Sequence, residues 1–87
     1  MAKVYNLDLE KSEFEAFNSN GYLITENTND YQATDYLLLN EYENIQTEES
    51  SPIEHPTGLY AMTQISQVIT DAGLKENHVL LILRKVN

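Results

Sequence analysis

The chain has 87 residues, and its five Lys and Arg stand against 14 Asp and Glu, which gives a formal net charge of -9. This length suits a single domain over residues 1–87 with a small core, because short chains bury a smaller share of their surface on folding. The absence of cysteine excludes disulfides and thiolate metal sites. The acidity disfavours DNA as a partner, because nucleic-acid affinity comes largely from Lys and Arg.

The sequence carries no signal for a membrane, a metal or another cofactor. No apolar run reaches the roughly 20 residues of a transmembrane helix, and residues 1–14 lack the apolar core of a signal peptide. We therefore expect a cytoplasmic protein without membrane contact. The two histidines, His55 and His78, stand outside any metal-binding spacing, so no metal site is expected.

The first elements predicted along the chain are a strand and a short helix. Residues 4–9 (VYNLDL) alternate apolar and polar side chains, which is typical of a half-buried strand. Ser12 and Glu15 have the S-x-x-E spacing of a capping box, which places the start of the helix at Ser12. Phe14 and Phe17 would share one helical face, and that face must pack on a sheet because two turns of helix do not persist alone.

Turn-forming residues then separate the helix from two further strands. Gly21 is available for a left-handed helix end, and residues 22–25 (YLIT) favour a short strand. Residues 36–39 (YLLL) are continuously apolar, as expected of a strand that is covered on both faces, and strand character continues to Tyr42. Asp35, just ahead of this strand, is placed to accept hydrogen bonds from turn N–H groups.

The second half of the chain predicts a long loop followed by two strands. Residues 43–56 are polar, acidic and without periodicity, which indicates a loop. Residues 59–68 alternate like a strand that is curved or bulged. Residues 78–86 (HVLLILRKV) form the strongest apolar run and predict a central strand. About five strands and one short N-terminal helix, without β-α-β alternation, favour a small α+β barrel with a long acidic loop.

A set of residues spread over nearly the whole chain keeps the order and spacing of one known family. These residues are Phe14, Glu15, Ala16, Phe17, Asp30, Tyr31, Gln32, Asp35, Leu37, Leu39, Glu41, Tyr42, Thr57, Gly58, Ile65, Gly73, Leu74 and residues 79–83. Their order resembles the ASCH domains of the PUA-like superfamily, and within these the small DUF3850 subgroup. The resemblance implies a β-barrel with a cleft beside the first helix that binds RNA or a nucleotide-like ligand.

The same resemblance implies a ligand motif that this chain lacks. A typical ASCH member has a Gly-Lys-Lys-Thr-x-Glu-x-Arg segment after the first helix, where this chain has residues 20–25 (NGYLIT). Both lysines are absent, and Leu23 and Thr25 stand roughly where the glutamate and the arginine would be. The positive charge that would meet a phosphate is therefore missing from this segment.

Some ASCH proteins are amidohydrolases that act on acetylated cytidine with a lysine, a threonine and a glutamate. If this chain were similar, Thr25 or Thr57 would supply the hydroxyl and Glu26 or Glu41 the carboxylate that deprotonates it. No lysine follows the first helix to support either pair. Hydrolysis of acylated nucleosides is therefore the third candidate function, after the two given next.

The leading interpretation is a non-enzymatic ASCH/PUA-like domain that holds RNA or a nucleotide-like ligand in an aromatic-lined cleft. Its candidate ligand-binding residues are Tyr22, Thr25, Tyr31, Asp35, Glu41, Tyr42 and Arg84. Tyrosine rings could stack a base, although packing in the core explains them as well, and a turn cap explains Asp35. The alternative is an acidic protein-interaction module whose carboxylates meet a basic protein partner.

Overall fold

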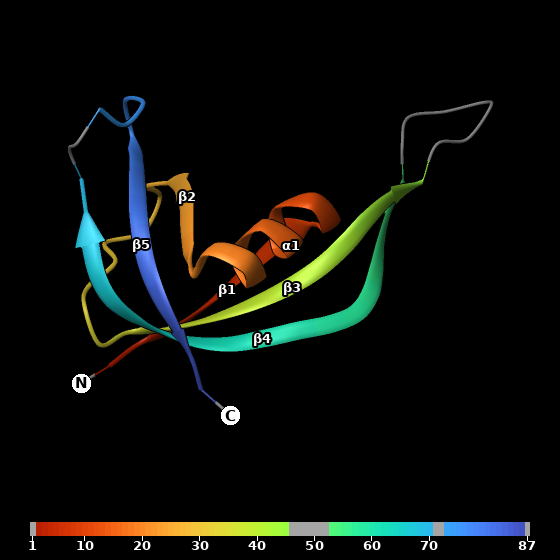
Figure 1. Cartoon of the computed structure of the whole chain (residues 1–87), viewed down its shortest axis with the longest axis horizontal. Coiled ribbons are helices and arrows are strands. Elements are labelled where there is room, and N and C mark those ends of the chain that lie inside the picture. The colour runs from red at the N-terminus through yellow and green to blue at the C-terminus, as the bar shows by residue number, and fades with distance from the viewer. Residues whose placement is uncertain (1, 46–52, 71–72, 87) are drawn as a thin grey trace.

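The computed structural model describes residues 2–45, 53–70 and 73–86. Its elements are β1 (Val4–Glu10), α1 (Lys11–Asn20), β2 (Tyr22–Glu26), β3 (Tyr36–Ile45), β4 (Ile53–Ile69) and β5 (His78–Lys85). The strands form one five-stranded sheet in the order β1-β3-β4-β5-β2 (Figure 1). β1 runs parallel to β3, and the other three pairings are antiparallel. The described residues thus form a sheet-rich fold of five strands in one open sheet with one short helix, in agreement with the number and kind of elements that the sequence predicted.

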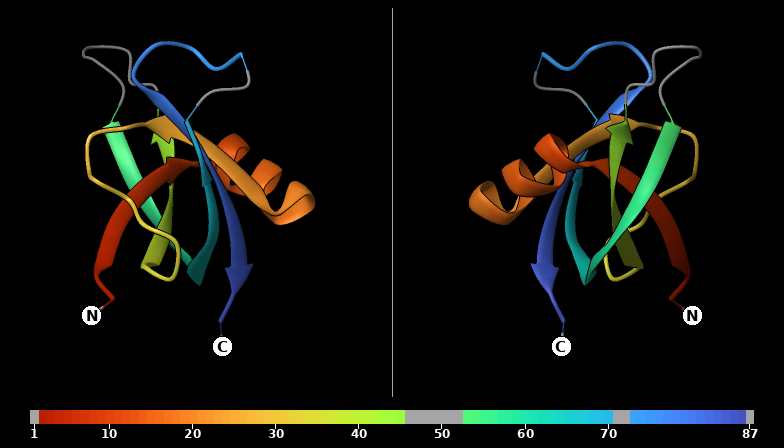
Figure 2. Two further views of the ribbon diagram at one scale, coloured as in Figure 1. Left: turned by 90° about the vertical axis from the view of Figure 1, so that its left-hand side faces the viewer. Right: turned by 90° about the vertical axis from the view of Figure 1, so that its right-hand side faces the viewer.

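The sheet curls around the helix. β4 is 17 residues long, and its first part pairs with β3 while its last part pairs with β5. β1 and β2 are the two edges of the sheet, whose curvature is visible from the ends in Figure 2. α1 lies on the concave side of β3 and β4 and packs against β1 and β3 (Figure 1). The described part of the chain contains no helix long and apolar enough to cross a membrane.

The core lies between α1 and the inner face of the sheet. Alternate residues of β3 and β5 face it, as the two-residue repeat of a strand requires; the fully buried ones are Leu37, Leu39, Val79 and Leu81. Tyr36 and Leu38 are half-buried, so β3 has one core face where its apolar run predicted two. β5 is an interior strand, but the centre of the sheet is β4.

Helix α1 packs on the sheet through the apolar face that the spacing of Phe14 and Phe17 predicted. Phe14 and Phe17 are both buried in the core. Gly21 ends the helix in the left-handed conformation with φ 77°, and its N–H donates to the Phe17 carbonyl over 2.8 Å. A glycine is favoured here because a side chain would strain this backbone.

The predicted capping box at the helix start is wrong. Helix α1 begins at Lys11 directly after β1, and the N-cap position is Glu10, whose side chain makes no capping hydrogen bond. Ser12 therefore lies inside the first turn, where its hydroxyl is not in the capping position. The spacing of Ser12 and Glu15 fits the motif, but the strand continues to Glu10 and fixes where the helix can begin.

The predicted loop over residues 43–56 is strand at both of its ends, over residues 43–45 and 53–56. β3 continues to Ile45 and β4 begins at Ile53, with these two residues paired across the hairpin; residues 46–52 lie outside the described residues. The prediction failed because the side chains of both strand ends, polar and apolar alike, are exposed or half-buried, so no two-residue repeat marks these segments. Pro56, paired with Tyr42, is tolerated next to a bulge, where ladder hydrogen bonds are interrupted.

β4 has two bulges, and the second lies within residues 59–68, for which the sequence predicted a curved or bulged strand. Asn40 pairs with Tyr60 and Tyr42 pairs with Pro56, so three residues of β4 stand opposite the single residue Glu41. The middle one of the three, Gly58, has φ 87°. A second irregularity follows between Ile65 and Gln67 of β4. Bulges of this kind increase the twist of a strand and redirect its side chains.

We expect Gly58→Ala to lower the free energy of unfolding by about 1–2 kcal/mol, because an L side chain is strained at positive φ. A Cβ atom at this position would meet no atom within 4 Å, so the backbone conformation alone would cause the loss. Urea denaturation followed by circular dichroism measures it. Gly58→Asn is the matched control. It should lose less stability than Gly58→Ala, since Asn tolerates the left-handed region better than Ala does. An alanine variant as stable as the parent would contradict the bulge geometry.

Candidate functional site

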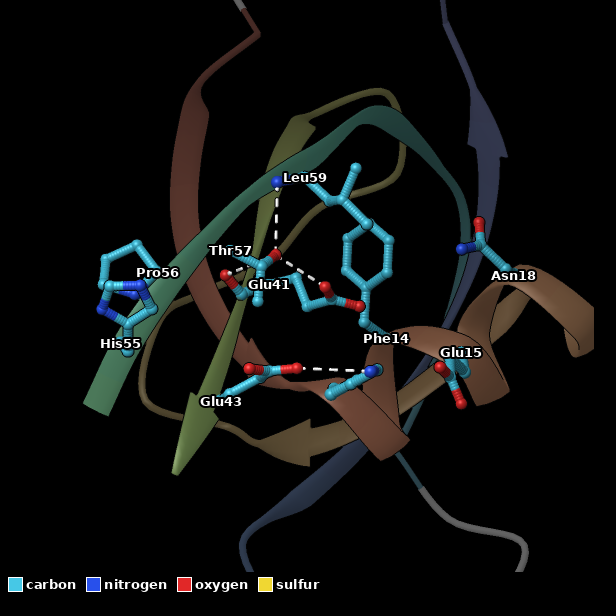
Figure 3. Close-up of a pocket in the computed structure, with 10 residues that line it drawn as sticks. Phe14, Glu15, Asn18, Glu41, Glu43, His55, Pro56, Thr57 and Leu59 are labelled. Atoms are coloured by element: carbon cyan, nitrogen blue, oxygen red, sulfur yellow. Dashed lines mark hydrogen bonds and ion pairs between the residues drawn. The ribbon is translucent and has the colours of Figure 1, made fainter. Parts of the chain in front are cut away.

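A pocket of about 500 Å³ lies between α1 and the β3–β4 hairpin (Figure 3). We call it the helix pocket. The residues that line it are Lys11, Phe14, Glu15, Asn18, Glu41, Glu43, His55, Pro56, Thr57 and Leu59. The four helical residues follow the spacing i, i+3, i+4 and i+7, which places them on one face of α1. The rest of the lining comes from β3 and from the bulged part of β4.

A buried carboxylate and a hydroxyl meet in this pocket. Glu41 is 4% exposed, and the Thr57 hydroxyl donates to its Oε1 atom over 2.6 Å. The Leu59 backbone N–H in turn donates to the Thr57 hydroxyl oxygen over 3.3 Å, which fixes the direction of the hydroxyl (Figure 3). The bulge opposite Glu41 produces this arrangement, because it turns the Thr57 side chain over β3. The second carboxylate oxygen of Glu41, Oε2, accepts no hydrogen bond from the described residues.

An ion pair lies at the rim of the helix pocket. Lys11 Nζ and Glu43 Oε1 are 3.2 Å apart, and both side chains are about half exposed. The hydrogen bond to Glu43 raises the pKa of Lys11, and the charges of Glu43 and Glu15 raise it further. Lys11 is therefore held in its charged form. With Glu15, Glu41 and Glu43 against one lysine, the lining has an excess of negative charge.

A second cavity of about 530 Å³ adjoins the first. It shares Phe14, Asn18 and Leu59 with the helix pocket and continues along α1 toward the end of β5. Its remaining lining residues are Tyr60, Ala61, Met62, Lys85 and Val86, so it is mainly apolar with one cation. We call it the apolar cavity.

A third, smaller cavity of about 320 Å³ lies on β1, β3 and β4. Its lining residues are Asp8, Asn40, Glu41, Tyr42, Glu54 and Pro56, which include three acids and no base. Burial raises the pKa of Tyr42, and the charge of Glu54 raises it further. The electrostatic environment here would favour a cation over an anion.

The structure brings Glu41 and Tyr42 to cavities, whereas none of the other five predicted ligand-binding residues lines any of the three. Tyr22 and Thr25 lie on the edge strand β2, paired with Ile82 and Val79 of β5. Arg84 is exposed on β5, where its guanidinium donates to the side chain of Gln64 on β4.

Tyr31 and Asp35 are part of the packed interior. Tyr31 is 4% exposed and packs edge to face on Tyr5 with ring centroids 5.1 Å apart. Asp35 accepts hydrogen bonds from the backbone N–H groups of Gln32 over 3.2 Å and of Lys3 over 3.0 Å. The turn-cap interpretation of Asp35 is confirmed, and the bond to Lys3 additionally ties the start of the chain to this turn.

Lys11, Asn18 and Lys85 are among the lining residues of these cavities that sequence reasoning missed. Lys11 and Asn18 could have been found from the helical spacing that includes Phe14, since all three share a face. Lys85 could have been distinguished from Arg84 by the alternation of β5, in which buried Leu83 and Lys85 share one face. The lysine near the pocket, Lys11, is the first residue of the helix and does not follow it.

Within the described residues, no group of three or more His, Asp or Glu side chains is placed to hold a metal ion. Neither a known protein-family model nor a curated protein sequence matches this chain. The resemblance to ASCH domains therefore stays a prediction that rests on the order and spacing of the motifs in the sequence.

Proposed function

We propose that this chain is an ASCH/PUA-like domain with a small barrel-like sheet, and that it binds a nucleoside or nucleotide-like ligand in the helix pocket. The observation that carries the proposal is the buried Glu41 carboxylate, fixed by Thr57 in a pocket beside the first helix. The resemblance places the family's ligand cleft beside the same helix. The pocket volume of about 500 Å³ falls within the range of small-molecule sites.

The polar groups of the helix pocket suit a base with an exocyclic amino group. A carboxylate accepts hydrogen bonds from such a group, as it does from the N4 amino group of cytosine. The Asn18 amide can both donate and accept, and the Phe14 ring and Leu59 supply apolar surface. The excess of carboxylates opposes a phosphate at this position. The base or the nucleoside, and not the phosphate, is therefore assigned to the helix pocket.

We expect Glu41→Gln to weaken cytidine binding by about tenfold or more, because a hydrogen bond to a charged acceptor contributes roughly 1.5–3 kcal/mol. The glutamine keeps the shape of the side chain and an oxygen that accepts from Thr57. Titration of the full chain with cytidine, adenosine and uridine, followed by NMR chemical shifts, measures the affinities. Uridine, which lacks the amino group, should bind more weakly than cytidine.

Glu26→Gln is the matched control, because it removes an exposed carboxylate on β2 that lines none of the three cavities, and it should change cytidine affinity little. If no nucleoside shifts the resonances of Phe14, Glu41 or Thr57, the proposal fails. That outcome would favour the acidic protein-interaction module, for which the third cavity supplies three acids and Tyr42 to a basic partner.

The contact between Thr57 and Glu41 favours a second candidate function, hydrolysis of an acylated nucleoside. A hydroxyl 2.6 Å from a carboxylate oxygen has the spacing of a nucleophile and its base. Thr57 would attack the acyl carbon while Glu41 takes the hydroxyl proton. The bond from the acyl carbon to N4 would then break as Glu41 passes this proton to N4, which releases the nucleoside, and water would hydrolyse the acyl ester on Thr57 to release the acid and restore the hydroxyl. The charged Lys11 at the pocket rim could stabilise negative charge that develops on the acyl oxygen. Replacing cytidine by N4-acetylcytidine and following the release of cytidine by chromatography, with Thr57→Val as control, tests this candidate.

A further inference from the structure

The helix pocket and the apolar cavity adjoin along α1, and we call the two together the groove. Phe14, Asn18 and Leu59 line both cavities, so the two are neighbours at these residues. Each cavity is about as large as the other, at about 500 and 530 Å³. A ligand that fills only the helix pocket would leave the second half of the groove empty.

The two ends of the groove differ in charge. The helix pocket end carries Glu15, Glu41 and Glu43, whereas the lining of the apolar cavity has one charged side chain, Lys85. The Lys85 Nζ atom lies 5.9 Å from the centroid of the Phe17 ring, a distance at which a cation is attracted to an aromatic face. Among the described residues, Lys85 forms no ion pair.

The alternation of β5 separates Lys85 from its neighbouring cation. Successive side chains of a strand point to opposite faces, and Arg84 bonds to Gln64 while Lys85 lines the groove. The groove thus has hydrogen-bond acceptors for an amino group at one end and a cation at the other. A ligand with matching ends carries a base on one side and an anionic group on the other.

We propose that the groove binds a nucleoside monophosphate, with the base in the helix pocket and the phosphate near Lys85. This inference rests on the proposed function and adds a phosphate position away from the acidic lining. The sugar would lie at the junction beside Phe14, Asn18 and Leu59. Lys85 on β5 would then supply the positive charge that the lysines after the first helix supply in typical ASCH members.

Titration of the full chain with cytidine and with cytidine 5′-monophosphate tests the inference. At low salt the monophosphate should bind about threefold tighter than cytidine, which corresponds to one partly exposed ion pair. Lys85→Gln should abolish this difference, and Arg84→Gln, the matched control on the opposite face of β5, should preserve it. Raising the salt concentration should shrink the difference by screening.

The outcomes separate the inference from the function on which it rests. If cytidine binds the parent, loses affinity in Glu41→Gln, and gains nothing from the phosphate, the monophosphate inference is wrong while the proposed function holds. The inference is also overturned if the Lys85→Gln variant still binds the monophosphate more tightly than cytidine. If neither compound binds, both proposals fail. A cytidine tetranucleotide that binds far tighter than the monophosphate would overturn the inference in favour of RNA.

Discussion

Replacing Phe17 with Ala is expected to lower the free energy of unfolding by about 3–5 kcal/mol, the range for removing a buried Phe ring from a core. Phe17 is 2% exposed, and its ring packs against that of Phe14 with centroids 6.4 Å apart. A domain of this length has a total stability of roughly 4–13 kcal/mol. The variant should therefore be near the limit of folding at room temperature. Urea denaturation followed by far-UV circular dichroism measures the loss.

Phe17→Leu is the matched control, because it keeps an apolar side chain of smaller volume and should lose clearly less than the alanine variant. The helix pocket should disappear with the helix, since α1 is too short to persist without its contacts to the sheet. A loss below about 1 kcal/mol for Phe17→Ala would contradict the packing of α1 on the sheet.

Replacing Asp35 with Ala is expected to lower the free energy of unfolding by about 2–4 kcal/mol, since two N–H groups lose their acceptor at a cost of roughly 1–3 kcal/mol each. One of these groups belongs to the turn at Gln32 and the other to Lys3, 32 residues away in sequence. The sequence predicted a turn cap, for which a loss of about 0.5–2 kcal/mol is typical. The additional bond to Lys3 accounts for the larger expected effect.

The free energy of unfolding of Asp35→Asn should lie between those of the parent and the alanine variant, because an amide keeps one oxygen acceptor in place of two. Asp30→Ala is the surface control: its carboxylate accepts an exposed hydrogen bond from the side chain of Gln32, and its loss should stay within about 0.5 kcal/mol. Equal denaturation midpoints for Asp35→Ala and Asp30→Ala would show that the partly buried hydrogen bonds of Asp35 contribute nothing to stability.

The local elements of this protein were predictable because their signals lie within a few residues. The alternation in residues 4–9, the spacing of Phe14 and Phe17, and the conformational freedom of Gly21 each act on nearby backbone. Where a distant contact intervened, prediction failed. The S-x-x-E spacing at Ser12 did not prevail over a strand that runs directly into the helix, and pairing across the hairpin made strands of a segment without visible periodicity.

The candidate site depended on contacts that no local pattern contains. Glu41 was predicted as a binding residue and Thr57 as one of two candidate hydroxyls, but their contact is a product of the bulge on β4. The tyrosines illustrate the opposite case, since Tyr31 is buried against Tyr5 while Tyr60 is 71% exposed. An aromatic side chain suits a core and a binding surface equally, so composition does not distinguish the two.

The sequence by itself determined the number and kind of elements, the apolar face of the helix and the turn that Asp35 caps. Only the tertiary structure decided which carboxylate meets a hydroxyl, that Lys85 and not Arg84 faces the groove, and that the groove is acidic at one end. The physical reason is that propensity and periodicity act over one or two turns of chain. The position of a side chain relative to a partner far along the sequence depends instead on strand register, which the packing of the whole sheet sets.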